Sequence, residues 1–201
     1  MKQYKKIFGI FRNPAVFKEM EALDPHKDHQ RMVHLGLCYE FPFDMVRANE
    51  LALFATYASV SISSLLDRTG EFSKHGQKRY DDTRFLITKF AEDGYDGPFG
   101  QRAIAQMNKI HGNFRIPNED FIFVLSTLIF YPMDWMEKYG WRRMLDKEKQ
   151  ALFLFYSALR GVPWQSTMLR NTRFLHAAPG SFDPVPLRRV LKQLYNTLNG
   201  L

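Results

Sequence analysis

The stretch that decides the fold runs from Arg102 to Phe114 and reads RAIAQMNKIHGNF. Its apolar side chains recur at intervals of three and four residues and end at His111, a spacing typical of one face of an α-helix. Gly112 is a stop signal, and the acidic residues at 118–120 are typical of the start of another helix. A histidine ending such a stripe can bind a metal through one ring nitrogen, or it can be a hydrogen-bonded core residue.

Apolar periodicity predicts helices along the rest of the chain. They are expected within 1–20 (short and amphipathic), over 24–36, 44–70, 81–93, 102–112, 118–138 and 149–161, and weakly over 184–198, with loops at 94–100 and 162–183. The 44–70 helix is apolar around most of its surface and is expected to lie deep inside the protein. Asp44 is the predicted cap of the 44–70 helix. Asp81 and Asp82 are the predicted cap and first-turn charge of the 81–93 helix. Pro132 is expected to bend or divide the 118–138 helix. No alternation of strands and helices occurs, so the sequence predicts an all-α protein.

The composition indicates one folded globular domain over residues 1–201, since 45% of the residues are hydrophobic and 24% are charged. A single cysteine, Cys38, excludes an internal disulfide framework and cysteine-based metal clusters. The sequence contains no P-loop, GxGxxG, HExxH, GxSxG or CxxC motif. It therefore argues against nucleotide-dependent kinases, Rossmann dehydrogenases, zincins and serine hydrolases.

The net charge of +7 favours anionic partners, but the basic residues are dispersed, so we expect no nucleic acid partner. No secretory signal is visible, and the strongest apolar run, Phe121 to Tyr131, is far shorter than the ~20 residues of a spanning helix. We expect a cytoplasmic protein with peripheral membrane contact. The side chains expected to touch a membrane are Lys2, Lys5, Lys6, Phe8, Phe11 and Arg12.

Two groups of residues suggest a metal or cofactor. His26, His29 and His34 form a weak candidate metal cluster that lacks a matching set of carboxylates. The second group consists of polar residues in or beside apolar helices: Glu50, Arg68, Thr69, Lys78, Arg79, Asp81, Asp82, His111 and Arg115. One imidazole with cations around an apolar pocket suits haem, because iron takes an axial nitrogen and the cations pair with the propionates.

Four stretches carry a family resemblance. They are residues 38–72 (CYEFPFDMVRANELALFATYASVSISSLLDRTGEF), 78–87 (KRYDDTRFLI), 107–127 (MNKIHGNFRIPNEDFIFVLST) and 141–156 (WRRMLDKEKQALFLFY). The chain resembles the MpaB-like oxygenases, relatives of the latex-clearing rubber oxygenases in a domain-of-unknown-function group, over residues 24–156. This resemblance implies a globin-like helical core with one haem b and O2-dependent cleavage of carbon–carbon double bonds in isoprenoid-like substrates.

The resemblance also implies roles for individual residues. His111 matches the proximal haem ligand, and Arg115 matches the basic residue one turn later. Arg68 and Thr69 match a distal Lys-Thr pair. Glu50, or Asn49 beside it, matches an acidic residue that removes an allylic proton. Met107 and Arg79 complete the predicted cofactor-binding set; core packing is the alternative for Met107, and an ion-pair knot with Asp81 or Asp82 is the alternative for Arg79.

The chain departs from the family pattern at two places. Arg68 replaces a lysine, and because a guanidinium is a very poor ligand, we expect it to hydrogen-bond bound dioxygen or a propionate instead. Residues 157–201 do not look like the family's usual tail. The leading prediction is a haem-dependent oxygenase, and the first alternative is a haem- or small-ligand-binding sensor or carrier without turnover. The last alternative is a basic helical module for anionic surfaces. The oxidant and the oligomeric state stay open.

Overall fold

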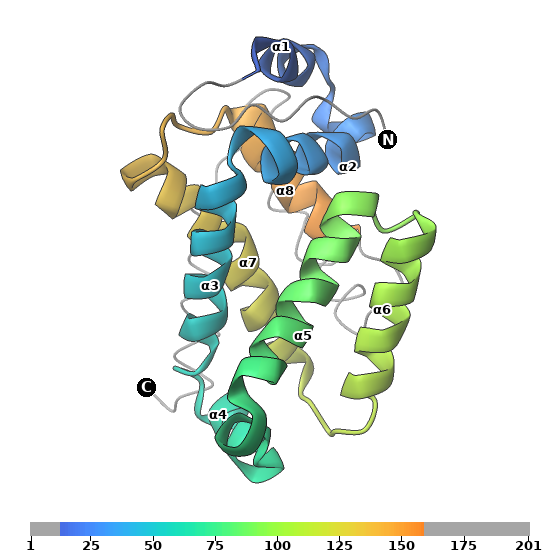
Figure 1. Ribbon diagram of the computed structural model, residues 1–201, viewed down its shortest axis with the longest axis vertical. Coiled ribbons are helices and arrows are strands. Elements are labelled where there is room, and N and C mark those ends of the chain that lie inside the picture. The colour runs from blue at the N-terminus through green and yellow to red at the C-terminus, as the bar shows by residue number, and fades with distance from the viewer. Residues whose placement is uncertain (1–12, 159–201) are drawn as a thin grey trace.

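The computed structural model describes residues 13–158, which form helices joined by short connections (Figure 1). The elements are α1 (Pro14–Ala22), α2 (Pro25–Leu35), the π-helix η1 (Gly36–Glu40), α3 (Pro42–Thr56), α4 (Val60–Thr69), α5 (Glu71–Asp93), α6 (Pro98–His111), α7 (Asn118–Lys138) and α8 (Asp146–Ser157). No β-strand occurs between residues 13 and 158, so the predicted all-α class is confirmed. The segments predicted for residues 1–12 and 159–201 lie outside the described residues.

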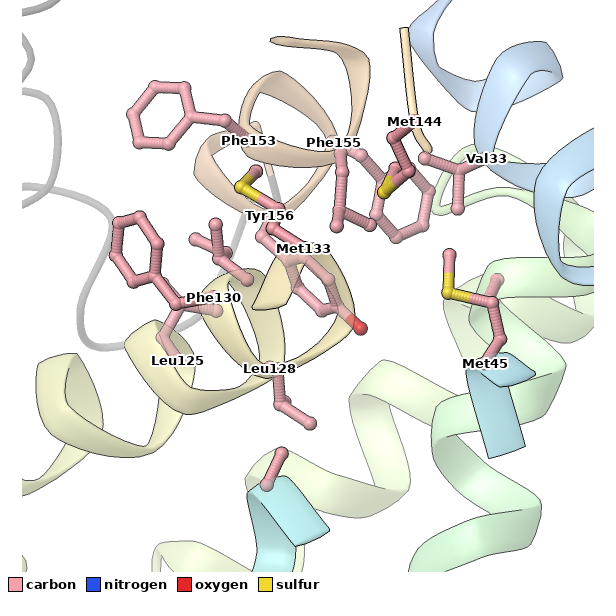
Figure 2. Packing of buried hydrophobic residues seen from close by; sticks show 14 of the residues in the cluster. Val33, Met45, Leu125, Leu128, Phe130, Met133, Met144, Phe153, Phe155 and Tyr156 are labelled. Atoms are coloured by element: carbon pink, nitrogen blue, oxygen red, sulfur yellow. The ribbon is translucent and has the colours of Figure 1, made fainter. Parts of the chain in front are cut away.

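Three helix pairs build the domain: α3 packs on α7, α2 packs on α8, and α5 packs on α6. Figure 1 shows α1 and α2 at one end of the molecule and α4 at the other, with α3, α5 and α6 running between them. The core lies where α7 and α8 meet these helices. Figure 2 shows Leu128 and Met133 of α7 and Phe155 and Tyr156 of α8 on one side, facing Val33 of α2 and Met45 of α3.

The prediction of one deep helix over residues 44–70 is wrong, because the segment divides into α3 and α4. Ser59 is buried and caps α4, where its Oγ accepts a hydrogen bond from the Ile62 amide at 3.5 Å. Ser59 and Ser61 also donate to the buried Asp120 carboxylate in the first turn of α7, at 3.5 and 2.6 Å. Side chain–backbone bonds of this kind favour a new helix start. The segment is also not deep, since no residue of α4 is buried and Phe54 of α3 is 73% exposed.

The predicted cap at Asp44 is also wrong. The helix α3 begins two residues earlier, at Pro42, whose fixed φ suits a first helical position. The Asp44 carboxylate is buried and accepts a hydrogen bond from Trp135 Nε1 at 3.0 Å. This contact ties the beginning of α3 to α7, so Asp44 serves tertiary packing.

Two predicted helix breaks do not occur. Asp81 and Asp82 lie inside α5, exposed, where Gln77 and Lys78 one turn earlier bind them at 3.0 and 2.5 Å. Such pairs stabilise a helix interior, so the acids require no helix start. The φ/ψ kink of α5 lies at His75 instead. Pro132 is buried inside α7, which runs unbroken from Asn118 to Lys138.

The predicted start of α2 at Asp24 and the predicted helix ends at Gly36, Gly70 and Gly112 are confirmed. Asp24 caps α2 by accepting from the His26 amide at 3.0 Å, and Gly70 ends α4 with a φ of +64°. The predicted loop at 94–100 is shorter than expected, because Pro98 already begins α6. A Cβ on Gly100 would lie only 1.8 Å from the Gly94 carbonyl oxygen. Glycine at position 100 therefore lets α6 start close against the end of α5.

A buried ion-pair knot fixes α8 and η1 to the connection after α7. The Arg142 guanidinium donates to Glu40 at 2.9 Å and to both carboxylate oxygens of Glu148 at 2.8 Å. Its carbon Cζ lies 4.6 Å from the centre of the Phe41 ring and 4.7 Å from that of Phe17. Because the two carboxylates are almost fully buried, the guanidinium supplies both their charge partner and their hydrogen bonds.

Candidate functional site

The site begins with the predicted stripe on α6, which the structure confirms as one buried face. Gly100, Ala103 and Ile104 are buried, Met107 packs against the core, and His111 is the last residue of the helix. The His111 ring packs edge-to-face on Phe121 of α7, with centroids 5.4 Å apart. Its Nδ1 atom is buried and has no hydrogen-bond partner in the part of the chain that the structure describes. His111 is therefore not the hydrogen-bonded core histidine of the alternative prediction.

The surroundings keep the His111 imidazole neutral. Burial lowers its pKa, and the positive charge of Arg79 on α5 lowers it further. Arg79 does not form the predicted knot with Asp81 or Asp82; it donates to Thr83 Oγ1 at 3.1 Å and lies 6.0 Å from the Phe72 ring centre. An axial haem ligand must be a neutral imidazole with a free nitrogen. His111 fits this requirement, and Arg79 places a cation in its electrostatic environment.

Three other predicted residues are exposed or bonded within their own helix. Arg68 is exposed on α4, where its Nε donates to the Ser64 carbonyl at 3.2 Å. Thr69 Oγ1 donates to the Leu66 carbonyl at 2.7 Å, as a side chain in a last helical turn often does. Arg115 is exposed and lies beyond the end of α6, so it does not share a helix face with His111. The structure records no hydrogen bond from these three side chains to the His111 ring.

Glu50 lies at a separate place, on the wall of a cleft between α3 and α5. The cleft has a volume of about 600 Å³ including its open mouth. Glu50 Oε1 accepts hydrogen bonds from Arg47 Nη2 at 2.7 Å and from the Tyr80 hydroxyl of α5. The carboxylate is therefore already paired with a cation. Asn49, the competing position for the predicted base, lines the same cleft.

The cleft is apolar except for a few groups. Its lining comes from α2, η1, α3, α5, α7 and α8: Val33, Leu37, Met45, Val46, Asn49, Glu50, Leu53, Tyr80, Arg84, Ile87, Thr88, Ala91, Pro132, Leu152 and Tyr156. Figure 2 shows Tyr156 extending from α8 with its hydroxyl directed toward the space beside Met45. Sequence reasoning missed Tyr80 and Tyr156. Tyr80 lies in the KRYDDT motif, which was a usable signal, whereas Tyr156 reads only as an apolar helix position.

Helix α5 connects the two places. Arg79 influences His111, whereas the next residue, Tyr80, bonds Glu50. Successive residues of an α-helix point about 100° apart, so two adjacent residues project toward different neighbouring parts of the fold. The structure thus separates the predicted residues into a histidine centre (His111, Arg79, Met107) and a cleft (Glu50).

The candidate cluster of His26, His29 and His34 does not form a metal site. His26 Nε2 bonds Gln150 at 2.9 Å, His29 Nε2 bonds the Tyr95 hydroxyl at 2.6 Å, and His34 Nδ1 bonds the Glu92 carbonyl at 2.7 Å. Each ring thus contacts a different part of the fold. Within residues 13–158, no group of three or more His, Cys, Asp or Glu side chains is placed to hold a metal ion.

Stability is expected to fall with pH below about 6.5, the ordinary pKa of an unfolded histidine. Burial lowers the pKa of His34, and its Nε2 is buried without a partner. The unfolded chain therefore takes up a proton first as the pH falls. The contribution of His34 is fully present above pH ~6.5 and declines toward its lower folded-state pKa, by up to about 1.4 kcal/mol per pH unit.

Urea unfolding at pH 7.5 and 5.5 measures this decline. His34→Gln keeps an N–H donor for the Glu92 carbonyl but cannot titrate, so it is expected to flatten the dependence. The matched control is His26→Gln at an exposed ring, which should leave the dependence unchanged. An identical pH dependence in His34→Gln and the parent protein would contradict the assignment.

Between residues 13 and 158, no helix combines the length and the apolar character needed to cross a bilayer. The described part is thus an all-α domain that combines a neutral histidine at a helix end with a separate apolar cleft. No family model matches the chain. Curated relatives do match it.

The chain is 35% identical to the ER-bound oxygenase mpaB of Penicillium roqueforti (strain FM164) over 166 residues, covering 78% of this chain and 52% of that protein. It is 34% identical to the ER-bound oxygenase mpaB' of Penicillium brevicompactum over 168 residues, covering 78% of this chain and 39% of that protein. The chain belongs to the MpaB-like family. It spans about half or less of the length of these relatives.

Proposed function

We propose that the chain acts as a haem b-dependent oxygenase on an apolar, unsaturated, isoprenoid-like substrate. The observation that supports this most directly is the buried, unpartnered Nδ1 of a neutral His111 at the end of an apolar helix face. The relatives that match the chain are named oxygenases, which supports the same chemistry. The proposal for the whole reaction rests on both.

In this proposal His111 holds the iron, and Met107 and Phe121 supply apolar packing near it. Burial and the charge of Arg79 both favour the neutral imidazole, and Arg79 would offer a cation for a propionate. Haem b, when bound, supplies the redox chemistry by which O2 reacts with a carbon–carbon double bond. Both oxygen atoms then enter the product, because cleavage of one C=C bond by one O2 gives two carbonyl groups.

The cleft binds and orients the apolar substrate and excludes water from it. Glu50 is the proposed base: its Oε1 atom would take an allylic proton once the Tyr80 hydroxyl moves away and would return it to the substrate carbon chain before product release, so that the overall reaction consumes only the alkene and O2. The Arg47 guanidinium holds the carboxylate in place. Arg68, Thr69 and Arg115 form no recorded hydrogen bond with His111 in the described part of the chain, so the proposal gives them no step.

The test starts from the full chain purified from cells supplied with a haem precursor. The expected results are a Soret band, one haem b per chain by pyridine haemochrome, and O2 consumption with an isoprenoid such as squalene. Carbonyl products should form at two per O2 consumed. A folded, colourless protein that also fails to take up added haem would overturn the proposal.

A second candidate function is haem or small-ligand binding without turnover, as in a sensor or carrier. One observation favours it: the proposed base, Glu50, is already paired with Arg47 and Tyr80. The same experiment separates the two functions, because a carrier shows the Soret band with neither O2 consumption nor carbonyl products.

We also propose peripheral contact with a membrane, in keeping with the ER-bound names of the relatives. Phe43 and Phe54 of α3 are 66% and 73% exposed, and the Arg47 guanidinium lies 5.7 Å from the Phe43 ring centre. Exposed aromatic rings with a cation beside one of them suit an anionic interface. Sedimentation with phosphatidylserine vesicles should carry the protein down, and Phe54→Ser should weaken this binding.

A further inference from the structure

The geometry points to a ligand class for the cleft between α3 and α5: an apolar chain that ends in a neutral hydroxyl, which donates its hydrogen bond to Asn49 Oδ1. This inference deepens the proposed function, on which it rests for its catalytic meaning. Binding itself is measurable without haem or turnover.

The walls suit a linear apolar molecule. Aliphatic side chains reach the cleft from four elements: Val33 of α2, Met45 and Leu53 of α3, Ile87 of α5 and Leu152 of α8. The space between these walls, about 600 Å³ in all, includes the open mouth, so part of a long ligand would remain in contact with solvent. Such a cleft removes most of the ligand's apolar surface from water, which is the main contribution to affinity.

One acceptor in this wall is left unsatisfied. Asn49 Oδ1 is buried and has no hydrogen-bond partner among the residues that the structure describes. Asn49 lies one turn after Met45 and one turn before Leu53, so it belongs to the row of α3 that faces the cleft. A buried acceptor without a partner is costly, and native structures rarely leave one. A ligand hydroxyl supplies the missing donor.

The opposite wall supplies the complementary group. Tyr156 is 4% exposed, lines the cleft and has its hydroxyl directed toward the space beside Met45 (Figure 2). Burial raises the pKa of Tyr156, so the phenol stays protonated and remains a donor. Tyr156 is therefore a second polar group of the cleft, a donor where Asn49 Oδ1 is an acceptor. An ether or a ketone can only accept and leaves Asn49 unpaired.

Asn49 also disfavours an ionised carboxylate at the end of the ligand, because a carboxylate only accepts hydrogen bonds. Glu50 lies on the same wall as Asn49 and is already paired with Arg47 and Tyr80. Arg84 lines the cleft, and its guanidinium lies 5.8 Å from the Tyr80 ring centre. A carboxylate would leave Asn49 Oδ1 unpaired, so an alcohol is the expected ligand rather than a fatty acid.

Competition with a bound fluorescent probe, Nile red, on the full haem-free chain tests the inference. The competitors are 1-dodecanol, methyl dodecyl ether and dodecanoate. Dodecanol is expected to bind about tenfold more tightly than the ether, because only the alcohol satisfies the buried acceptor. Asn49→Leu should reduce this ratio to about one while the ether binds as before. Gln106→Leu, at an exposed position of α6 away from the cleft, is the matched control and should keep the tenfold ratio.

Several results would overturn the inference. Equal binding of alcohol and ether by the parent protein removes the role of Asn49, and this comparison requires no variant to fold. Preference for the ether or for dodecanoate contradicts the polarity assigned to the site. Failure of dodecanol to displace the probe would mean that another segment or ligand fills the cleft. Displacement of dodecanol by added haem would mean that the cleft is part of the haem cavity. Loss of the Soret band with retained dodecanol selectivity would instead refute only the proposed oxygenase.

Discussion

Arg142→Ala is expected to lower the free energy of unfolding by about 3–5 kcal/mol, because it leaves two buried carboxylates without their cation. Arg142 binds Glu40 through Nε and Glu148 through both terminal nitrogens, at distances of 2.8–2.9 Å. The side chains of the two acids are only 2% and 4% exposed, so water cannot replace the guanidinium. The variant also loses the packing of the guanidinium on Phe41. Urea unfolding followed by circular dichroism measures the difference.

The neighbouring arginine provides a matched control. Arg143 forms an ion pair with Glu137 at 3.1 Å, but its side chain is 76% exposed. Surface pairs of this kind contribute about 0–1 kcal/mol, so Arg143→Ala should change stability by less than that. Equal losses in the two variants would contradict the buried role of Arg142. Arg142→Lys keeps the charge without the bidentate geometry and should fall between them.

The contrast between α6 and α4 shows where sequence reasoning is sufficient. The apolar stripe of α6 ends at His111 and Gly112 as predicted, so local rules and packing agree there, although the helix begins at Pro98, four residues before the predicted start at Arg102. In α3 and α4 the apolar residues surround the helix, and periodicity cannot show which of them a neighbour covers. The structure leaves Phe54 and Val60 mostly exposed. Their burial depends on contacts that a local pattern does not contain.

Contacts between distant residues account for the other differences. Glu40 and Arg142 are 102 positions apart, and Asp44 and Trp135 are 91 apart, so no local spacing links them. The break at Ser59 depends on Asp120 in another helix. By contrast, the pairs that keep Asp81 and Asp82 inside α5 are four residues apart and were visible in the sequence. The cap prediction failed there because helix pairing and capping use the same acidic residues.

The candidate site divides in the same way. The sequence selected His111 and Glu50, and the structure gives each a defined environment. The sequence could not show that the Tyr80 hydroxyl donates a hydrogen bond to Glu50, because the two residues lie on different helices and are 30 positions apart. The sequence also could not show that Arg68 Nε donates a hydrogen bond to the Ser64 carbonyl of its own helix. Both features depend on how α3, α4 and α5 are placed relative to one another.

His111→Ala is expected to abolish haem retention while the fold persists. The axial bond is lost outright, so the fall in haem affinity should exceed the 10–100-fold that is typical of losing only an outer-shell partner. Stability should change by less than about 2 kcal/mol, since the buried Nδ1 makes no hydrogen bond that the variant would break. The ring contact with Phe121 is the main loss. The Soret band of protein purified after haem supplementation measures retention, and urea unfolding measures stability.

Two comparisons make this prediction specific. His26→Ala removes an exposed histidine whose Nε2 bonds Gln150, and it should retain haem at the level of the parent protein. Added imidazole can occupy the space left in His111→Ala and should restore part of the Soret band, because the missing group is then supplied from solution. Full retention of haem by His111→Ala would refute the ligand assignment. Loss of both the Soret band and the fold would contradict the prediction that His111 contributes little to stability. In that case His111→Gln, which keeps most of the side-chain volume, tests haem ligation in a folded chain.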